Sequence, residues 1–382
     1  MRSFVIRHSK AGSIMKTIAR IAGAGLAALA ATAFSAVPAS ATTTEQNSPV
    51  FVQSDNPNGN TVVAYHREAD GALTQSGVYA TGGLGGVAAG SVVDHLTSQG
   101  SLAYDRSAGL LYAVNAGSGT ITVFAVHGDQ LERTQVIATG GSFPNSIAVH
   151  GGLVYVLNGL NGGSIQGFLR VGDRLRRVSS WKRDLHLATD GGTAGQVAFT
   201  PDGSKLVVTT RGNGDSVDVF PVSLLGPAAK PIVYTKAGSA PFGFTFDTNG
   251  HLVLTEAGPN DVATFTVARN GRLTQIDEVA TGQAGTCWVV RDGDFVYASN
   301  AASGTLSRYQ VGGTGSLTAF GQTATDAGTV DAAVSSDGRN IYVQTGANGI
   351  VDEFRVNADG GLTRIGSVTV PDAVGGEGIA AV

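Results

Sequence analysis

The sequence predicts an all-β protein, a seven-bladed β-propeller with four antiparallel strands per blade. One unit of four short strands recurs from Ser101 to the last residue, and its first strands begin at intervals of 43 to 51 residues. Propeller blades have a length of about 40–50 residues. The composition agrees, because 55 glycines and only 11 prolines in 382 residues suit a chain with many tight turns.

Each unit contains the same four parts in the same order. An apolar first strand, as in residues 144–149, leads through a Gly-centred turn to a second strand that often ends in Asn, as in 153–158. An alternating third strand such as 216–220 follows, and a Leu-Thr-type strand such as 273–274 closes the unit after another Gly turn. Four such strands are typical of one blade.

Ring closure follows from counting the strands. First strands begin near Ser101, Pro144, Gly195, Pro241, Ala284, Gly328 and Gly376. The last of them, residues 378–382, has no partner strands after it, whereas 50–53, 61–65 and 72–75 read as a second, third and fourth strand without a first. We therefore expect the C-terminal strand to join the N-terminal strands, because a closed ring leaves no unpaired sheet edge.

The first 41 residues have the pattern of a signal peptide. A short basic start near Met15 precedes the small apolar run 21–33, and residues 39–41 form a small-residue cleavage site. We expect cleavage after Ala41, a secreted protein, and a single propeller domain over 42–382. The apolar run is too short to span a membrane.

The charge of the expected mature chain limits its partners. The leader carries five basic residues and no acidic one, so its removal changes the formal net charge from −4 to −9. An acidic exported chain is unsuited to sequence-independent binding of nucleic acid. We expect a monomer without a cofactor. We also expect no metal, because the Asp-Gly turns, such as 202–203, lack the further oxygen ligands of a calcium loop. The single cysteine, Cys287, lies in an apolar strand and is expected to be buried and inert.

The repeat resembles the lactonase-like seven-bladed propellers, the group that contains bacterial 6-phosphogluconolactonases and fungal 3-carboxy-cis,cis-muconate cyclases. The resemblance covers residues 50–382, rests on segments such as 196–203 and 209–220, and is strongest to exported actinobacterial members of the group. It implies a propeller and, more weakly, lactone chemistry, since propellers host many unrelated activities. Enzymatic relatives carry Pro-His pairs where first strands enter the ring, and the corresponding positions here hold other residues, such as Pro144-Asn145.

Two charged residues remain as catalytic candidates. Arg211 ends a second strand, and Glu256 occupies the same place one blade later. A carboxylate that activates water and a cation that stabilises an oxyanion are what lactone hydrolysis needs. A structural ion pair, or two separately solvated side chains, is the alternative interpretation.

The strand directions predict that the ligand-binding residues lie on the same face of the ring as Arg211 and Glu256. Starts of first strands and ends of second strands share one face, which also receives the long connections 81–98 and 181–193. The residues expected to bind a ligand there are Gln99, Asn145, Gln196, Asp331, Glu377 and His95.

Three classes of function fit these features. The first is a secreted module that binds a small molecule, glycan or protein at the channel mouth. The second is a lactone hydrolase or muconate-type cycloisomerase acting on an unphosphorylated substrate. The third is a structural envelope protein. The residues alone favour the binding module, because it needs no catalytic histidines.

Overall fold

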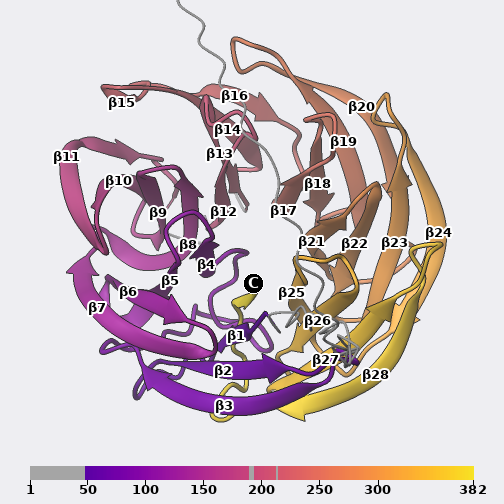
Figure 1. The fold of residues 1–382 in the computed structure, drawn as a ribbon. Coiled ribbons are helices and arrows are strands. Elements are labelled where there is room, and N and C mark those ends of the chain that lie inside the picture. Colours follow the sequence, from indigo (N-terminus) through magenta and orange to yellow (C-terminus); the bar gives the residue numbers. More distant parts are fainter. Residues whose placement is uncertain (1–47, 189–192, 212–213) are drawn as a thin grey trace, which may run out of the picture. The chain divides into compact units, whose positions relative to one another are not determined.

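Seven antiparallel sheets form a ring in the computed structural model, which describes residues 48–188, 193–211 and 214–382 (Figure 1). In six of the sheets the strands follow one another in sequence, from an inner first strand to an outer strand at the rim. The predicted seven-bladed propeller is thus confirmed. The signal peptide predicted for residues 1–41 lies outside the described residues.

The first three blades follow chain order. Blade 1 contains β4 (Leu102–Asp105), β5 (Leu110–Asn115), β6 (Thr120–His127) and β7 (Gln130–Ala138), with a single 3-10 turn, η1 (Ala116–Ser118), between β5 and β6. Blade 2 contains β8 (Ser142–His150), β9 (Leu153–Leu160), β10 (Ser164–Val171) and β11 (Arg174–Asp184). Blade 3 contains β12 (Ala194–Phe199), β13 (Lys205–Thr210), β14 (Ser216–Ser223), β15 (Gly226–Pro227) and β16 (Ile232–Thr235).

The next three blades repeat the pattern without irregular strands. Blade 4 contains β17 (Pro241–Phe246), β18 (Leu252–Glu256), β19 (Asp261–Val267) and β20 (Leu273–Ala280). Blade 5 contains β21 (Thr286–Asp292), β22 (Phe295–Asn300), β23 (Thr305–Val311) and β24 (Leu317–Ala324). Blade 6 contains β25 (Thr329–Val334), β26 (Asn340–Thr345), β27 (Ile350–Val356) and β28 (Leu362–Thr369).

Blade 7 joins the two ends of the described chain, as predicted. Its order is β29 (Ile379–Ala381), β1 (Val50–Gln53), β2 (Thr61–Arg67) and β3 (Leu73–Ala80). The antiparallel register between β1 and β29 opposes Val50 to Ala381 and Val52 to Ile379. The C-terminal strand is therefore the inner strand of a blade whose other three strands come from the N-terminal side.

Two elements differ from the sequence-based expectation. The fourth strand of blade 3 is divided into β15 and β16, both of which pair with β14. In blade 2, β11 continues through residues 181–184, which the sequence assigned to a long connection. The reason is the buried Trp181, whose ring stacks on Tyr155 with the centroids 6.0 Å apart. The register with β10 shifts next to this ring, where Phe168 opposes Arg177 and Gln166 opposes Lys182, and pairing then resumes beyond the predicted end of the strand.

Buried apolar side chains between neighbouring blades form the core, and tyrosines on the second strands link one blade to the next. The Tyr297 hydroxyl donates a hydrogen bond to the Gly360 carbonyl at 2.8 Å, and Tyr342 donates to the Gly71 carbonyl at the same distance. Both glycines have positive φ, so the turns that precede the fourth strands present their carbonyls to the neighbouring blade. The second bond ties blade 6 to blade 7.

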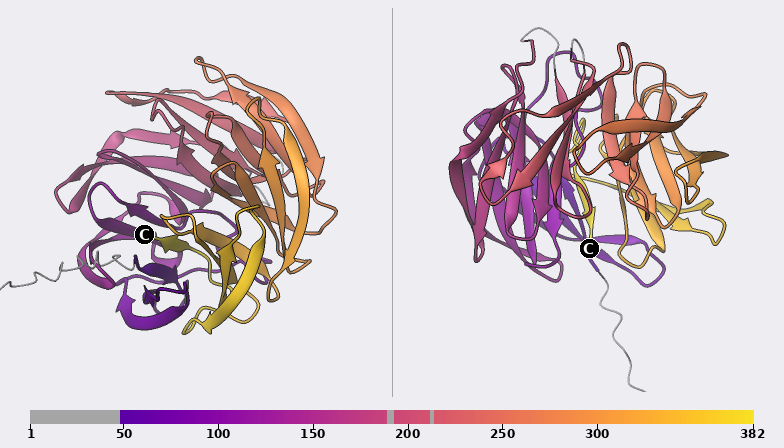
Figure 2. Two further views of the ribbon diagram at one scale, coloured as in Figure 1. Left: turned by 45° about the vertical axis from the view of Figure 1, so that its right-hand side comes forward. Right: turned by 90° about the horizontal axis from the view of Figure 1, so that it is seen from above.

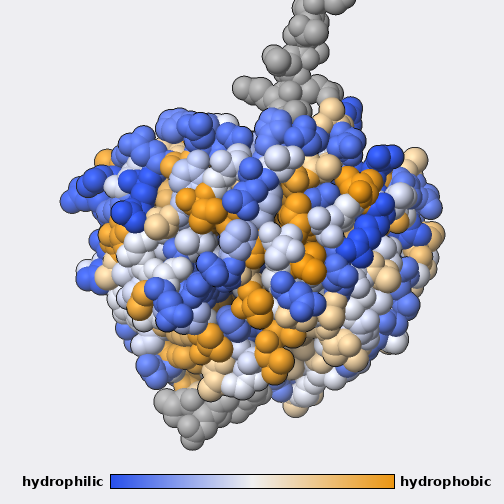
Figure 3. All heavy atoms as spheres, turned by 90° about the horizontal axis from the view of Figure 1, so that it is seen from below, coloured by the Kyte–Doolittle hydropathy of each residue, from blue (hydrophilic) through white to orange (hydrophobic). Residues whose placement is uncertain are grey.

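The ring has two distinct faces. First strands begin and second strands end at one face, which we call the mouth face, and the C-terminal residue lies at the opposite face (Figure 2). The side of the ring seen in Figure 3 carries mostly hydrophilic side chains with smaller apolar groups among them. Among the described residues, no helix has the length and apolarity needed to cross a membrane.

Candidate functional site

The connection between β3 and β4 bonds to blades 3 and 5. Three consecutive residues near its end contact other blades: the Thr97 carbonyl accepts a hydrogen bond from Arg211 Nη2 at 2.6 Å, and the Ser98 carbonyl accepts one from Trp288 Nε1 at 2.5 Å. The N–H of Gln99, the third, donates to the Gly195 carbonyl at 3.0 Å. The partners belong to blades 3 and 5, so this segment lies across the centre of the ring.

Three of the predicted ligand-binding amides are engaged by the protein itself. Gln99 bonds to the backbone of Val289 in blade 5. Asn145 Nδ2 donates to the Ala194 carbonyl at 2.9 Å, and Gln196 Oε1 accepts from the Phe244 N–H at 2.6 Å. Each of the last two bonds joins a first strand to the next blade. These side chains therefore hold neighbouring blades together at the mouth, a role that the sequence analysis did not predict.

A pair of buried carboxyl groups lies beneath this segment. Glu377, just before β29, is fully buried and Asp94 is 8% exposed, and a hydrogen bond joins their side chains. Ser98 Oγ also donates to Glu377 Oε1, and the Thr97 N–H donates to Asp94 Oδ1 at 2.7 Å. A hydrogen bond between two carboxyl groups needs one of them to be protonated, and the raised pKa of both groups favours this.

Burial raises the pKa of every carboxyl group in this cluster. It is the largest influence on Asp94 and on Glu377, and it places the pKa of Glu377 well above its usual range. Asp55 and Asp331, two further buried members, have pKa values raised to about 7 by burial. Asp55 Oδ2 accepts the Glu377 N–H at 2.8 Å, which joins the end of β1 to the start of β29. We call Asp55, Asp94, Asp331 and Glu377 the axial carboxyl cluster.

Arg211 is the cation next to this cluster. It follows β13, is half-buried, and packs its guanidinium 4.2 Å from the centroid of the Phe242 ring. Its Nε donates to Thr193 Oγ1 at 3.0 Å. Burial lowers the pKa of its guanidinium, and the charges of Asp94 and Glu377 offset part of this effect. Among the described residues, no hydrogen-bond partner is found for Nη1. This group can therefore donate to a carbonyl oxygen.

Two residues of the site have an uncommon backbone conformation, and a histidine lies beside Asp94. Thr97 has a φ of 54° and Asp55 a φ of 53°, values that are uncommon outside glycine and that concentrate at functional sites. His95, half-buried beside Asp94, donates its backbone N–H to the Gly375 carbonyl at 2.8 Å. Burial lowers the pKa of its imidazole. We therefore assign His95 to the rim of the site as a neutral side chain.

Glu256 belongs to a different cluster. It is fully buried at the end of β18, where Oε2 lies 2.5 Å from Lys236 Nζ. In the described part of the chain no ion pair joins Glu256 to Arg211, the residue with which the sequence analysis paired it, and Lys236 is the cation in contact with Glu256. The physical reason is the position of Lys236, just after β16, which brings an ammonium group to Glu256 from the neighbouring blade. The carboxyl groups whose charges act on Arg211 are those of Asp94 and Glu377.

The structure therefore assembles part of the predicted set. Arg211, Asp331, Glu377 and His95 gather around the axial carboxyl cluster, whereas sequence reasoning missed Asp55 and gave Asp94 no role of its own. The sequence feature that could have indicated a role for Asp94 is its position next to His95 in a long connection. Asp55 has no such feature in the sequence. Cys287, expected to be buried, is partly exposed, and burial of its thiol raises the pKa to about 12, which disfavours the thiolate at neutral pH.

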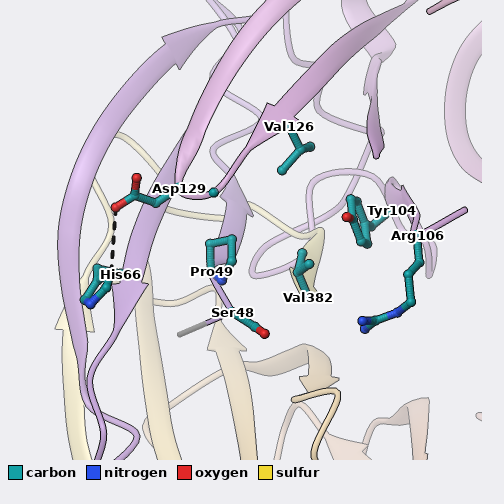
Figure 4. A pocket seen from close by; sticks show the side chains of 9 residues that line it. Ser48, Pro49, His66, Tyr104, Arg106, Val126, Asp129 and Val382 are labelled. Carbon is teal, nitrogen blue, oxygen red and sulfur yellow. Dashed lines mark ion pairs between the residues drawn. The ribbon is translucent and has the colours of Figure 1, made fainter. Parts of the chain in front are cut away.

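A cavity lies on the face opposite the mouth, between blades 7 and 1. It has a volume of about 520 Å³, and its lining includes Tyr104 and Arg106 at the end of β4 and Val126 of β6 (Figure 4). His66 and Asp129 form an ion pair of 3.8 Å at its edge. An aromatic ring and a guanidinium thus line one cavity that no prediction included.

Comparisons with known proteins find a lactonase-family match in part of the chain. Residues 254–376, about a third of the chain, match the family model described as Lactonase, 7-bladed beta-propeller. This part of the chain is lactonase-like. The search of curated proteins gave no match.

Several solved structures share the fold. A protein from Lactobacillus plantarum is 22% identical with a TM-score of 0.70, and the match covers 86% of this chain and 98% of that one. A putative 6-phosphogluconolactonase from Bacteroides fragilis is 20% identical with a TM-score of 0.66, over 87% and 98%. The periplasmic gluconolactonase of Pseudomonas aeruginosa is 18% identical with a TM-score of 0.67, over 87% and 98%. At these identities the likeness shows the fold alone.

Proposed function

We propose that the protein is a lactone hydrolase whose site is the Arg211 side of the axial carboxyl cluster. The observation that carries this proposal is the placement of Arg211 beside the hydrogen-bonded pair Asp94–Glu377. A pair that shares one proton supplies a base and an acid together, and an adjacent guanidinium supplies a donor for a carbonyl oxygen. Perturbed titration of several buried groups in one place is itself typical of a functional site.

Each group has a defined part in ring opening. Arg211 donates a hydrogen bond to the lactone carbonyl oxygen, and water adds to the carbonyl carbon while giving a proton to the ionised member of the pair. The ring carbon–oxygen bond then breaks, and the ring oxygen takes a proton from the protonated member. The pair ends the cycle with one proton, and the product is the open hydroxy acid.

The substrate class is an unphosphorylated sugar-type lactone. The lactonase match of residues 254–376 and the gluconolactonase names of two fold neighbours support lactone chemistry. The predicted leader supports export, where phosphorylated sugar lactones, which are cytoplasmic metabolites, are not available. Acid release from gluconolactone and a panel of other unphosphorylated lactones tests the activity. No acceleration over buffer with any lactone would exclude this function.

Export has its own test. We expect the secreted protein to begin at Thr42, and N-terminal sequencing of culture supernatant reads this directly. A chain that begins at Met1 or Met15 in the cytoplasmic fraction would contradict export and remove the argument against phosphorylated substrates.

A second candidate function is binding of a small acidic ligand or glycan without catalysis. The cavity of about 520 Å³ beside Tyr104 and Arg106 favours it, because an aromatic face and a guanidinium together suit a sugar acid. A thermal-shift series with aldonic and uronic acids, repeated with Arg106→Ala, tests this candidate. A shift that persists in Arg106→Ala would move the binding site elsewhere.

A further inference from the structure

Three carboxyl groups of blade 4 converge at the mouth-side edge of its sheet, away from the proposed catalytic site. Glu256 ends β18, Asp261 begins β19 directly opposite it, and Glu278 lies on β20. One oxygen from each residue lies within 4.8 Å of the other two. The sequence did not reveal this group, because its members are separated along the chain and meet only through the register of three strands.

Two of these carboxyl groups are buried with an oxygen that lacks a partner. Glu256 is fully buried and Asp261 is 3% exposed. In the described part of the chain, Glu256 Oε1 and Asp261 Oδ1 accept no hydrogen bond. A buried acceptor left in this state costs about 1–3 kcal/mol, so such groups usually have a partner. The two unpartnered oxygens belong to the same cluster of three carboxyl groups.

Lys236 is the one cation in contact with the group among the described residues. Its Nζ lies 2.5 Å from Glu256 Oε2 and 2.7 Å from Glu278 Oε2. Among the described residues no ion pair joins this ammonium to Asp261, and its two printed contacts are with the Oε2 atoms, so neither involves an unpartnered oxygen. Its side chain is 29% exposed, so the ammonium can turn to solvent.

We propose that Glu256, Asp261 and Glu278 form a binding site for a divalent cation of the calcium type. Oxygen ligands from carboxylates are what Ca²⁺ prefers, and because each bond is about 2.3–2.6 Å long, two oxygens on one ion lie at most roughly 5 Å apart. The spacing within 4.8 Å meets this limit. Mg²⁺, with bonds of about 2.0–2.1 Å and a strict octahedron, would need a tighter cluster.

Bound cation and ammonium compete for the same carboxylates in this proposal. Ca²⁺ takes Glu256, Asp261 and Glu278 as ligands, and Lys236 releases Glu256 and Glu278. A cation site therefore differs from an ordinary ion-pair network in the expected effect of removing Lys236 on cation affinity. Removing the lysine charge tightens cation binding, although the same change removes two ion pairs from the protein alone.

The experiment is equilibrium dialysis of the chelator-treated full chain with radioactive Ca²⁺, together with thermal melting in CaCl₂. We expect one ion per chain and a rise in melting temperature with Ca²⁺ that MgCl₂ at equal concentration does not match. Lys236→Met should bind Ca²⁺ about tenfold more tightly, as expected when a unit charge a few ångströms away is removed. Asp261→Asn combined with Glu278→Gln should abolish binding.

A second carboxyl cluster gives the matched control. In blade 6, Arg364 Nη2 bonds Asp326 at 2.7 Å and Asp352 at 2.5 Å. Asp326→Asn should therefore leave Ca²⁺ binding unchanged. Absence of Ca²⁺ binding in the wild-type chain and in folded Lys236→Met would overturn the proposal, as would binding that survives in the Asp261→Asn and Glu278→Gln double variant. If Lys236→Met does not fold, the wild-type and double-variant dialysis decides the question.

Discussion

Gln99 forms two hydrogen bonds with the backbone of Val289 across the ring axis. Its Nε2 donates to the Val289 carbonyl at 2.9 Å, and its Oε1 accepts from the Val289 N–H at 3.0 Å. The two residues belong to the starts of blades 1 and 5, and Gly243 provides the space beside Oε1, where a β-carbon would overlap it. This amide therefore ties opposite sides of the ring together and holds the segment that covers the axial carboxyl cluster.

Gln99→Ala should lower the free energy of unfolding by about 2–4 kcal/mol, because it leaves a buried N–H and a buried carbonyl of Val289 without partners. Chemical denaturation followed by circular dichroism measures this. Gln130→Ala, at an exposed position of β7, is the control and should change the value by less than about 0.5 kcal/mol. Equal effects of the two variants would show that the amide is no tie across the ring.

Removal of residues 375–382 should unfold or aggregate the protein. The deletion takes away β29, whose pairing with β1 completes blade 7, and exposes a sheet edge at the centre of the ring. Size-exclusion chromatography and a thermal melt measure the outcome. A truncated protein that stays monomeric and melts within a few degrees of the full chain would mean that closure contributes little.

Stability should depend on pH through Asp331. Burial raises the pKa of its carboxyl group from 3.8 to about 7, with the charge of Asp94 adding to the effect, so between these values the folded state keeps a proton that the unfolded state has lost. The contribution of Asp331 to the free energy of unfolding therefore falls as pH rises from about 4 to about 7. The size of this fall is roughly 4 kcal/mol at most.

Asp331→Asn isolates this contribution, because it removes the titration. Denaturation at pH 5 and pH 8 should show a smaller loss of stability in the variant than in the wild type, and Asp173→Asn, at an exposed position, should behave as the wild type. Asp202, with its pKa lowered to about 2, should titrate alike in all three proteins, whereas Asp55, whose pKa the charge of Asp331 helps to raise, should shift with the variant. An identical pH dependence in Asp331→Asn and wild type would refute the assignment.

The fold could be predicted because its information is local and repeated. The Asp-Gly turn at 70–71 and the alternation of residues 61–65 are visible without any partner strand. The strand count then required the C-terminal residues 378–382 to join them. Where the predicted strand end was wrong, a tertiary contact sets the actual end. The stacking of Trp181 on Tyr155 extends β11 in this way.

The site was predictable only in part, because it depends on how one connection crosses the ring. The strand ends in the sequence predicted Arg211, Asp331 and Glu377 as site residues. The sequence analysis paired Arg211 with Glu256 of the neighbouring blade, whereas the charges that act on it are those of Asp94 and Glu377. Thr97 joins Arg211 to Asp94, because its carbonyl accepts a hydrogen bond from the guanidinium and its N–H donates to the carboxyl group, and no repeat pattern specifies the path of this segment. Lys236 likewise reaches Glu256 from an irregular segment after the divided fourth strand of blade 3.

The central claim is that Arg211 and the Asp94–Glu377 pair open a lactone. Its most direct test is kcat/KM for unphosphorylated gluconolactone, or for the best lactone of the panel, in the wild type, Arg211→Met and Glu377→Gln, with folding checked by circular dichroism. Arg269→Met, at an exposed position, is the matched control, and Arg211→Lys is the milder substitution should Arg211→Met not fold.

We predict a wild-type rate above buffer, a loss of about 10²-fold or more in Arg211→Met and in Glu377→Gln, and no change in Arg269→Met. A wild-type protein that opens no lactone, or folded Arg211→Met and Glu377→Gln variants that retain the wild-type kcat/KM, would contradict the account.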